Sequence, residues 1–188
     1  MTTTTVQSRV ELKYCVPELV AVEVLAEARH YLVPEPLARG PRQHITSLYL
    51  DTDELTFLRW HREGATERHK LRIRAYGSLP AATLYLELKS KNGQIVRKER
   101  MPFIGVLRDA VLTECRARYG ATPQTLVNVV RESLRDPGLA TAVTVDRSLR
   151  YQATTRGELV GDARKWRPLP LPPCAGPAAV LKIGRAHV

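Results

Sequence analysis

The chain has 188 residues, 44% of them apolar, with 29 Lys+Arg against 19 Asp+Glu and a net charge of +10. This length corresponds to about one domain, and the apolar fraction is sufficient for a hydrophobic core. The positive charge predicts an anionic partner, which leaves nucleic acid, a phosphate-rich small molecule and an acidic membrane surface open.

Several classes of protein are excluded by the same inspection. No apolar run approaches the ~18 residues of a membrane-spanning helix, and residues 1–6 lack the charged start and apolar stretch of a secretory signal. The cysteines, Cys15, Cys115 and Cys174, are odd in number and form no C-x-x-C motif. This pattern argues against a disulfide framework or zinc knuckle and predicts a cytoplasmic protein.

The first third of the chain alternates strand and helix patterns. Residues 8–14 alternate strictly between apolar and charged side chains, which predicts a half-buried strand. From Pro17, apolar residues recur every three or four positions, so we expect a helix that ends near Pro34. Residues 45–51 have the composition of a second strand.

The central stretch carries basic residues at alternating positions. Over 68–76 they occupy the even positions, opposite an apolar face. Residues 84–91 alternate in the same way, Asn92-Gly93 predicts a tight hairpin turn, and a third strand follows at 95–101.

The remainder adds a helix, two β-rich runs and a proline-rich loop. Helical spacing covers 104–118, and the β-rich runs lie around 126–132 and 142–151. Proline is frequent from Pro168 to Pro177, which indicates a connecting loop. The order predicts a single antiparallel α+β or barrel-like domain.

Two interpretations of the basic strands compete. Like charges two residues apart on a strand lie about 7 Å from each other, and at an effective dielectric of 20 they repel by roughly 2.4 kcal/mol. An open, solvated basic face would cost little. A closed or cupped basic face would need a polyanion, and the arginines of 68–74 suit phosphate. Glu11 and Glu87 share these faces, either as ligands of a bridging metal or as cross-strand ion pairs.

At these residues the sequence resembles the VTC domain, the catalytic module of polyphosphate polymerases in the triphosphate tunnel metalloenzyme superfamily. The pair Arg72-x-Arg74 followed by Tyr76-Gly77 is the most specific part of the resemblance. The matching segments are residues 9–14, 47–51, 68–77, 86–89, 97–100 and 144–147.

The resemblance implies an α+β fold: an antiparallel β-barrel tunnel with a few flanking helices and a basic lumen for ATP or polyphosphate. It implies manganese or magnesium as cofactor, held by Glu11 and Glu87. Because related enzymes work beside membrane proteins, it also implies a membrane-protein partner. The residues that it makes phosphate ligands are Lys13, Lys70, Arg72, Arg74, Lys89, Lys98, Arg100 and Arg131.

The sequence departs from the family pattern at a few positions. Val129 stands where the family has a tyrosine, and Ala142 where it tends to have a basic residue. The related CYTH branch begins with Glu-x-Glu-x-Lys, but here Arg9 takes the first position, which favours the VTC-like branch.

The C-terminal end is expected to be incomplete. Residues 183–188 match the translation of a common sequencing adapter, so we expect them to be a non-native tail. The family's last strand, with a metal-binding glutamate and a lysine, should begin near Val180, and we expect it to be missing. We therefore divide the chain into a tunnel domain (1–167), a proline-rich loop with the start of a truncated strand (168–182) and the tail.

The function expected from these observations is metal-dependent phosphoryl transfer on ATP or polyphosphate. The alternatives are a CYTH-like triphosphatase, a polyphosphate-binding domain without activity, and a basic RNA-binding module. Aromatic residues make up only 6% of the chain and none pair for base stacking on the basic strands, so nucleic acid is the weaker partner. Asp51-Thr-Asp53 is interpreted as an acidic turn, not a metal site.

Overall fold

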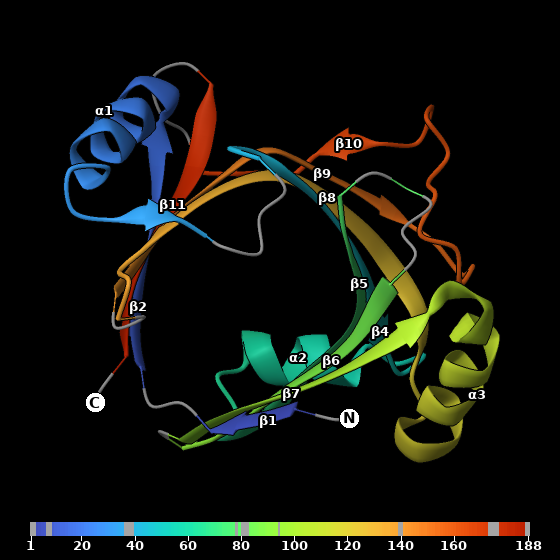
Figure 1. Cartoon of the computed structure of the whole chain (residues 1–188). Coiled ribbons are helices and arrows are strands. Elements are labelled where there is room, and N and C mark those ends of the chain that lie inside the picture. The colour runs from blue at the N-terminus through green and yellow to red at the C-terminus, as the bar shows by residue number, and fades with distance from the viewer. Residues whose placement is uncertain are drawn as a thin grey trace. The chain divides into compact units, whose positions relative to one another are not determined.

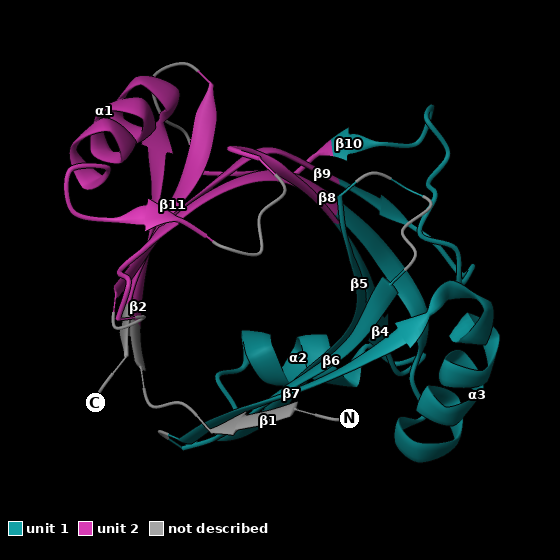
Figure 2. Cartoon of the chain, viewed as in Figure 1, with its two compact units in different colours: residues 1–7, 46–127, 151–167 teal, residues 8–45, 128–150, 168–188 magenta. Residues whose placement is uncertain are grey.

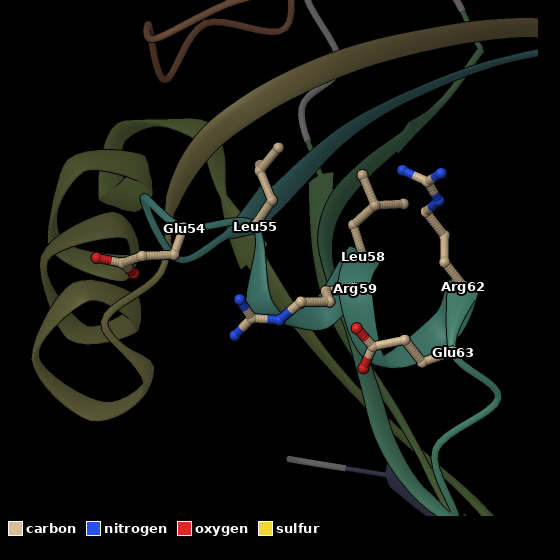
Figure 3. A pocket seen from close by; sticks show the side chains of 6 residues that line it. All are labelled: Glu54, Leu55, Leu58, Arg59, Arg62 and Glu63. Atoms are coloured by element: carbon tan, nitrogen blue, oxygen red, sulfur yellow. The ribbon is translucent and has the colours of Figure 1, made fainter.

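The structure, a computed structural model, describes residues 3–6, 9–35, 40–77, 79, 83–93, 95–138, 141–172 and 177–186 (Figure 1). The chain forms two units, coloured separately in Figure 2. Unit 1 comprises residues 1–7, 46–127 and 151–167, and unit 2 comprises residues 8–45, 128–150 and 168–188.

The described elements are mostly strands, with three α-helices. In chain order they are β1 (Thr3–Val6), β2 (Arg9–Pro17), α1 (Glu18–Ala28), β3 (Val33–Pro34), β4 (Gln43–Asp51), α2 (Thr56–Arg62), β5 (Glu67–Tyr76), β6 (Thr83–Asn92), β7 (Ile95–Ile104), a 3-10 turn (Gly105–Leu107), α3 (Arg108–Tyr119), β8 (Thr122–Arg135), β9 (Thr141–Ala153), β10 (Arg167–Pro168) and β11 (Ala178–Ala186). Antiparallel pairing joins β1 to β7, β7 to β6, β6 to β5, β9 to β11 and β11 to β2. The predicted α+β class with an antiparallel sheet is confirmed.

Unit 1 is a sheet with one apolar and one charged face. Its strands follow the order β1-β7-β6-β5-β4, and the first half of β8 continues it. The alternation of β5 buries Leu71, Ile73 and Ala75 on the apolar face. Side chains from both helices pack there, including Phe57 of α2 and Cys115 of α3. The opposite face therefore receives the charged side chains of the same strands.

Helix α2, which the sequence analysis did not predict, is held by the end of β4. The Asp51 carboxylate accepts hydrogen bonds from the backbone N–H groups of Phe57 (2.8 Å) and Leu58 (2.9 Å). It also accepts one from Thr52 N–H at 2.8 Å. These bonds satisfy the free donors at the start of the helix. The interpretation of Asp51-Thr-Asp53 as a turn is thus confirmed, and its first residue is a helix cap.

Unit 2 is a smaller sheet covered by α1. The second half of β8 is followed by β9, β11 and β2. Ala21 and Leu25 of α1 are buried against Val145 and Leu181. Helix α1 ends at Ala28, several residues before the predicted end near Pro34, because Val33–Pro34 instead pairs with β8 as the short strand β3. Of the helices in the described residues, none has the length and apolarity to span a membrane.

A strand begins close to Val180, where the family's last strand was expected, although it contains no glutamate. The assignment of residues 183–188 to a non-native tail stays a prediction. Ala178–Ala186 forms β11, which pairs with both β2 and β9 and extends into the segment that we assigned to a tail. Ala179 and Leu181 alternate with Val180 and Lys182, so one face of β11 enters the core beside Leu25. Burial of this apolar face explains why the segment pairs as a strand.

A buried ion-pair network fastens α1 to the sheet of unit 2. Glu132 of β8 is 6% exposed, and its carboxylate contacts Arg147 (Nη1, 3.3 Å) and Arg29, which follows α1. The Arg147 guanidinium also reaches Glu18 at the start of α1. Removing one partner of such a network leaves a buried charge uncompensated.

We predict that Glu132→Ala lowers the free energy of unfolding by about 3 kcal/mol, because Arg147 then loses a buried counter-ion. Urea denaturation of the whole chain measures the change. The control is Glu23→Ala, an exposed acidic residue of α1, with an expected change within about 0.5 kcal/mol. Equal effects of the two substitutions would contradict a stabilising role for the network.

Candidate phosphate-binding site

The charged face of unit 1 is a grid of cations around one carboxylate. Strand register places Lys70, Lys89 and Lys98 directly opposite one another on β5, β6 and β7. In the next row Glu87 lies between Arg72 and Arg100. We use "charged face" for Lys70, Arg72, Arg74, Glu87, Lys89, Lys98 and Arg100, which were all predicted site residues.

Glu87 is the centre of this grid and is almost fully buried, at 2% exposure. Its Oε2 accepts hydrogen bonds from Arg72 Nε (2.9 Å) and Nη2 (2.6 Å). Arg74 Nη1 lies 3.6 Å from the same oxygen. Lys98 Nζ and Arg100 Nε each lie 3.5 Å from Oε1. Four cations from the two flanking strands, β5 and β7, therefore converge on a single carboxylate of β6.

Two of these arginines are also held from β4. Arg72 Nη1 donates to Tyr49 Oη at 3.0 Å, and Arg74 Nε donates to Ser47 Oγ at 3.0 Å. Each guanidinium thus has partners on two sides, which limits its rotation. Arg74 is only 7% exposed, so the charged face is not an open solvated surface at this position. The arginines converge on Glu87 as cross-strand ion pairs, which was one of the two roles expected for this carboxylate, whereas Lys70 and Lys89 of the same face are exposed.

Aromatic rings flank the cations at the end of β5. The Arg100 guanidinium lies 3.7 Å from the ring centroid of Tyr85 and 5.0 Å from that of Tyr76. The two rings meet edge to face at 5.6 Å. Such cation–π contacts stabilise a desolvated cation. Neither tyrosine was predicted as a site residue, and their contact corrects the expectation that no aromatic residues pair on the basic strands.

Burial and charge oppose each other at Glu87. Burial alone would raise the pKa of the Glu87 carboxyl, but the charges of Arg72, Arg74 and Lys98 lower it to about 2. Burial lowers the pKa of the Lys98 ammonium group. The negative charge of Glu87 raises it, and the positive charges of Arg72 and Arg74 lower it further. Glu87 is consequently ionised at neutral pH.

A second group of predicted residues lies in unit 2. Arg131 donates to Asp146 through Nε (2.6 Å) and Nη2 (2.8 Å), and Lys182 Nζ donates to the same carboxylate. Lys13 and Lys182 are directly opposite on β2 and β11, and Lys13 Nζ lies 3.1 Å from Glu11. Neither Asp146 nor Lys182 was among the predicted site residues. Asp146 lies in the matching segment 144–147, which was a usable signal for it.

The two carboxylates expected to bind a metal have other partners. Glu87 is surrounded by four cations, and Glu11 pairs with Lys13. Within the part of the chain that the structure describes, no three His, Cys, Asp or Glu side chains come together as a metal-binding group. A divalent cation beside Glu87 would meet four positive charges, so Glu87 does not fit a resident metal. The role of Glu11 stays a prediction.

We predict that Glu87→Gln destabilises the protein at neutral pH and that the loss shrinks in acid. The folded pKa of about 2 lies below the ordinary value of 4.5, so Glu87 contributes about 3 kcal/mol above pH 4.5. That contribution is lost progressively as the pH falls toward 2. Urea denaturation of both proteins across this range tests the prediction, and a pH-independent difference would refute it.

The fold was compared with solved structures. A Bacillus halodurans protein with a proposed adenylate cyclase activity superposes with a TM-score of 0.55 at 10% identity, covering 98% of this chain and 81% of that protein. A Pyrococcus horikoshii protein gives a TM-score of 0.52 at 14% identity, covering 94% of this chain and 77% of the other. At such identities the likeness concerns the fold. No curated protein matches the sequence.

The sequence was also compared with protein families. The profile of the VTC domain matches residues 8–105, which is more than half of the chain. The matched span contains β2 and the whole charged face of β5, β6 and β7. The chain therefore belongs to the VTC domain family.

Proposed function

We propose that the charged face of unit 1 binds the phosphates of ATP or polyphosphate and supports phosphoryl transfer of the polyphosphate polymerase type. The observation that carries this proposal is the register of Lys70, Lys89 and Lys98 beside arginines that share one carboxylate. A row of lysines above an arginine row presents ammonium and guanidinium donors to a single extended anion.

The lysine row is accessible to an anionic ligand. Side chains directly opposite on neighbouring strands have Cβ atoms about 5 Å apart. Two like charges at that distance repel by less than about 1 kcal/mol in bulk water. Lys70 and Lys89 are exposed and Lys98 is 43% exposed, so solvent screens most of this repulsion. The row therefore presents solvent-accessible ammonium groups to an extended anion.

The reaction requires position and charge more than a protein nucleophile. A terminal phosphate oxygen of a polyphosphate chain attacks the γ-phosphorus of ATP, and ADP leaves with the bridging oxygen of the broken bond. Arg74 is already oriented by Ser47, so it can stabilise charge on the transferring group without reorganisation. Arg72, bonded to both Tyr49 and Glu87, holds these neighbouring side chains in position. With water as the attacking group, the same site would act as a triphosphatase.

A divalent cation, magnesium or manganese, belongs to this proposal as part of the substrate. Magnesium is commonly bound through substrate phosphates with few protein carboxylates. Glu11 is paired with Lys13, and Glu87 is paired with four cations. These ion pairs are consistent with a metal that binds together with ATP. Because both carboxylates already have cationic partners, a second candidate function is a polyphosphate-binding domain without catalytic activity.

Compartment and partners are proposals from the sequence. A cytoplasmic location rests on cysteine use, because the cysteines are odd in number and form no C-x-x-C motif. A membrane-protein partner rests on the family resemblance alone.

We predict that Arg72→Ala with Arg74→Ala abolishes polyphosphate formation from ATP, because both oriented guanidinium groups are lost. Lys98→Ala, at a more exposed position, should reduce it roughly tenfold or more. The matched control is Arg97→Ala, the preceding residue of β7 on the opposite face, which should leave the rate unchanged. Unchanged activity in the double variant would refute the proposal, whereas phosphate binding without turnover in the unsubstituted protein would select the binding-only candidate.

We also predict that tripolyphosphate displaces a labelled oligonucleotide from the protein at low salt. A grid of cations with few stacking aromatics should prefer dense phosphate charge to nucleic acid. Fluorescence anisotropy measures the displacement. Oligonucleotide binding that tripolyphosphate does not compete would favour a nucleic-acid-binding module instead.

A further inference from the structure

Glu87 lies where an anionic ligand of the charged face would make its contacts. Register sets it between Arg72 and Arg100, with Lys89 and Tyr85 on either side along β6. Its oxygens receive Arg72 at 2.6 and 2.9 Å, and the other three cations approach within 3.5–3.6 Å. Tyr76 Oη adds a contact of 3.4 Å to Oε1. A carboxylate has about four acceptor positions, and the hydrogen bonds from Arg72 and Tyr76 use three of them.

The four cations are not equally committed to Glu87. Arg72 makes two short bonds to it and one to Tyr49, so its nitrogens are engaged within the protein. Arg74, Lys98 and Arg100 contact Glu87 at 3.5 Å or more, which is long for a hydrogen bond. These three therefore retain donor capacity for a second anion.

We infer that Glu87 is the internal counter-ion of the phosphate site: it holds Arg72 directly, and it competes with bound phosphate for Arg74, Lys98 and Arg100. This inference rests on the proposed function and replaces the role of metal ligand expected for Glu87. The negative charge of Glu87 stabilises the fold when the site holds no ligand. The same charge lowers the affinity of the site for condensed phosphate. A site of this kind binds its ligand with limited affinity and can release a phosphorylated product.

The direction of the effect distinguishes this role from the alternatives. A counter-ion that competes with phosphate predicts tighter binding when its charge is removed while its shape is kept. A metal ligand predicts unchanged metal-free binding and a shifted metal requirement. A residue that only orients the cations predicts weaker binding, because their geometry is lost.

The test is tripolyphosphate binding to the whole chain in EDTA, measured by calorimetry for the unsubstituted protein and Glu87→Gln. We expect binding to tighten roughly tenfold and its salt dependence to steepen, because the site gains one net positive charge. The matched control is Glu99→Gln on β7. It changes the total charge equally, but it lies on the opposite face, paired in register with Leu88, and should alter binding less than about twofold.

The other outcomes overturn the inference. Weaker binding of Glu87→Gln shows an orienting role only, and unchanged metal-free binding with an altered magnesium requirement shows a metal ligand. Failure of the unsubstituted protein to bind tripolyphosphate would instead refute the proposed function, and the inference with it. These failures are distinguishable because the first two leave binding by the unsubstituted protein intact.

A second measurement keeps the inference testable if Glu87→Gln does not fold. Carbon-13 NMR of the Glu87 carboxyl carbon in the unsubstituted protein follows its titration, with and without saturating tripolyphosphate. We expect the titration midpoint to rise from about 2 by roughly one unit or more, because bound phosphate draws the cations away. An unchanged or lower midpoint would overturn the competition between Glu87 and phosphate.

Discussion

The attraction between a buried carboxylate and four cations organises the charged face of unit 1. Burying Glu87 without partners would be very costly, and burying Arg72 or Arg74 alone would be equally so. Together they satisfy one another, with Tyr49 and Ser47 of β4 completing the hydrogen bonds. The positions of the basic side chains therefore depend on a carboxylate that carries the opposite charge.

An acidic residue on a basic sheet face can therefore be a counter-ion of the cations, not only a ligand of a metal. A glutamate among phosphate-binding cations resembles a metal ligand in sequence, because both roles place a carboxylate on the basic face. The contacts of Glu87 separate the two roles: its oxygens are occupied by guanidinium, ammonium and phenol groups. Asp146 repeats the arrangement in unit 2, where Arg131 and Lys182 share it. In both units a buried carboxylate fixes the cations of its own sheet.

The preorganised cations would allow the proposed phosphoryl transfer to proceed without a nucleophilic side chain. Phosphoryl transfer is accelerated chiefly by orientation and by charge stabilisation, and both follow from the rigidity of the arginines. The apolar face supports that rigidity, since Leu71 and Ile73 alternate with Arg72 and are buried beneath α2 and α3. Core packing and site geometry thus depend on one alternating pattern along β5.

The sequence by itself determined the strands of the charged face, because a period of two fixes which side chains share a face. Arg72, Arg74, Lys89 and Lys98 follow from that pattern. It could not give the contacts of Glu87, since these depend on the register between β5, β6 and β7.

The other features that the sequence did not predict also depend on contacts between residues that are far apart in the chain. The sequence did not indicate α2, whose start is capped by Asp51 of the preceding strand. It also did not give the pairing of β11, in which Ala179 and Leu181 are buried against α1. Local alternation thus determined which residues point together, whereas tertiary packing decided which charges meet.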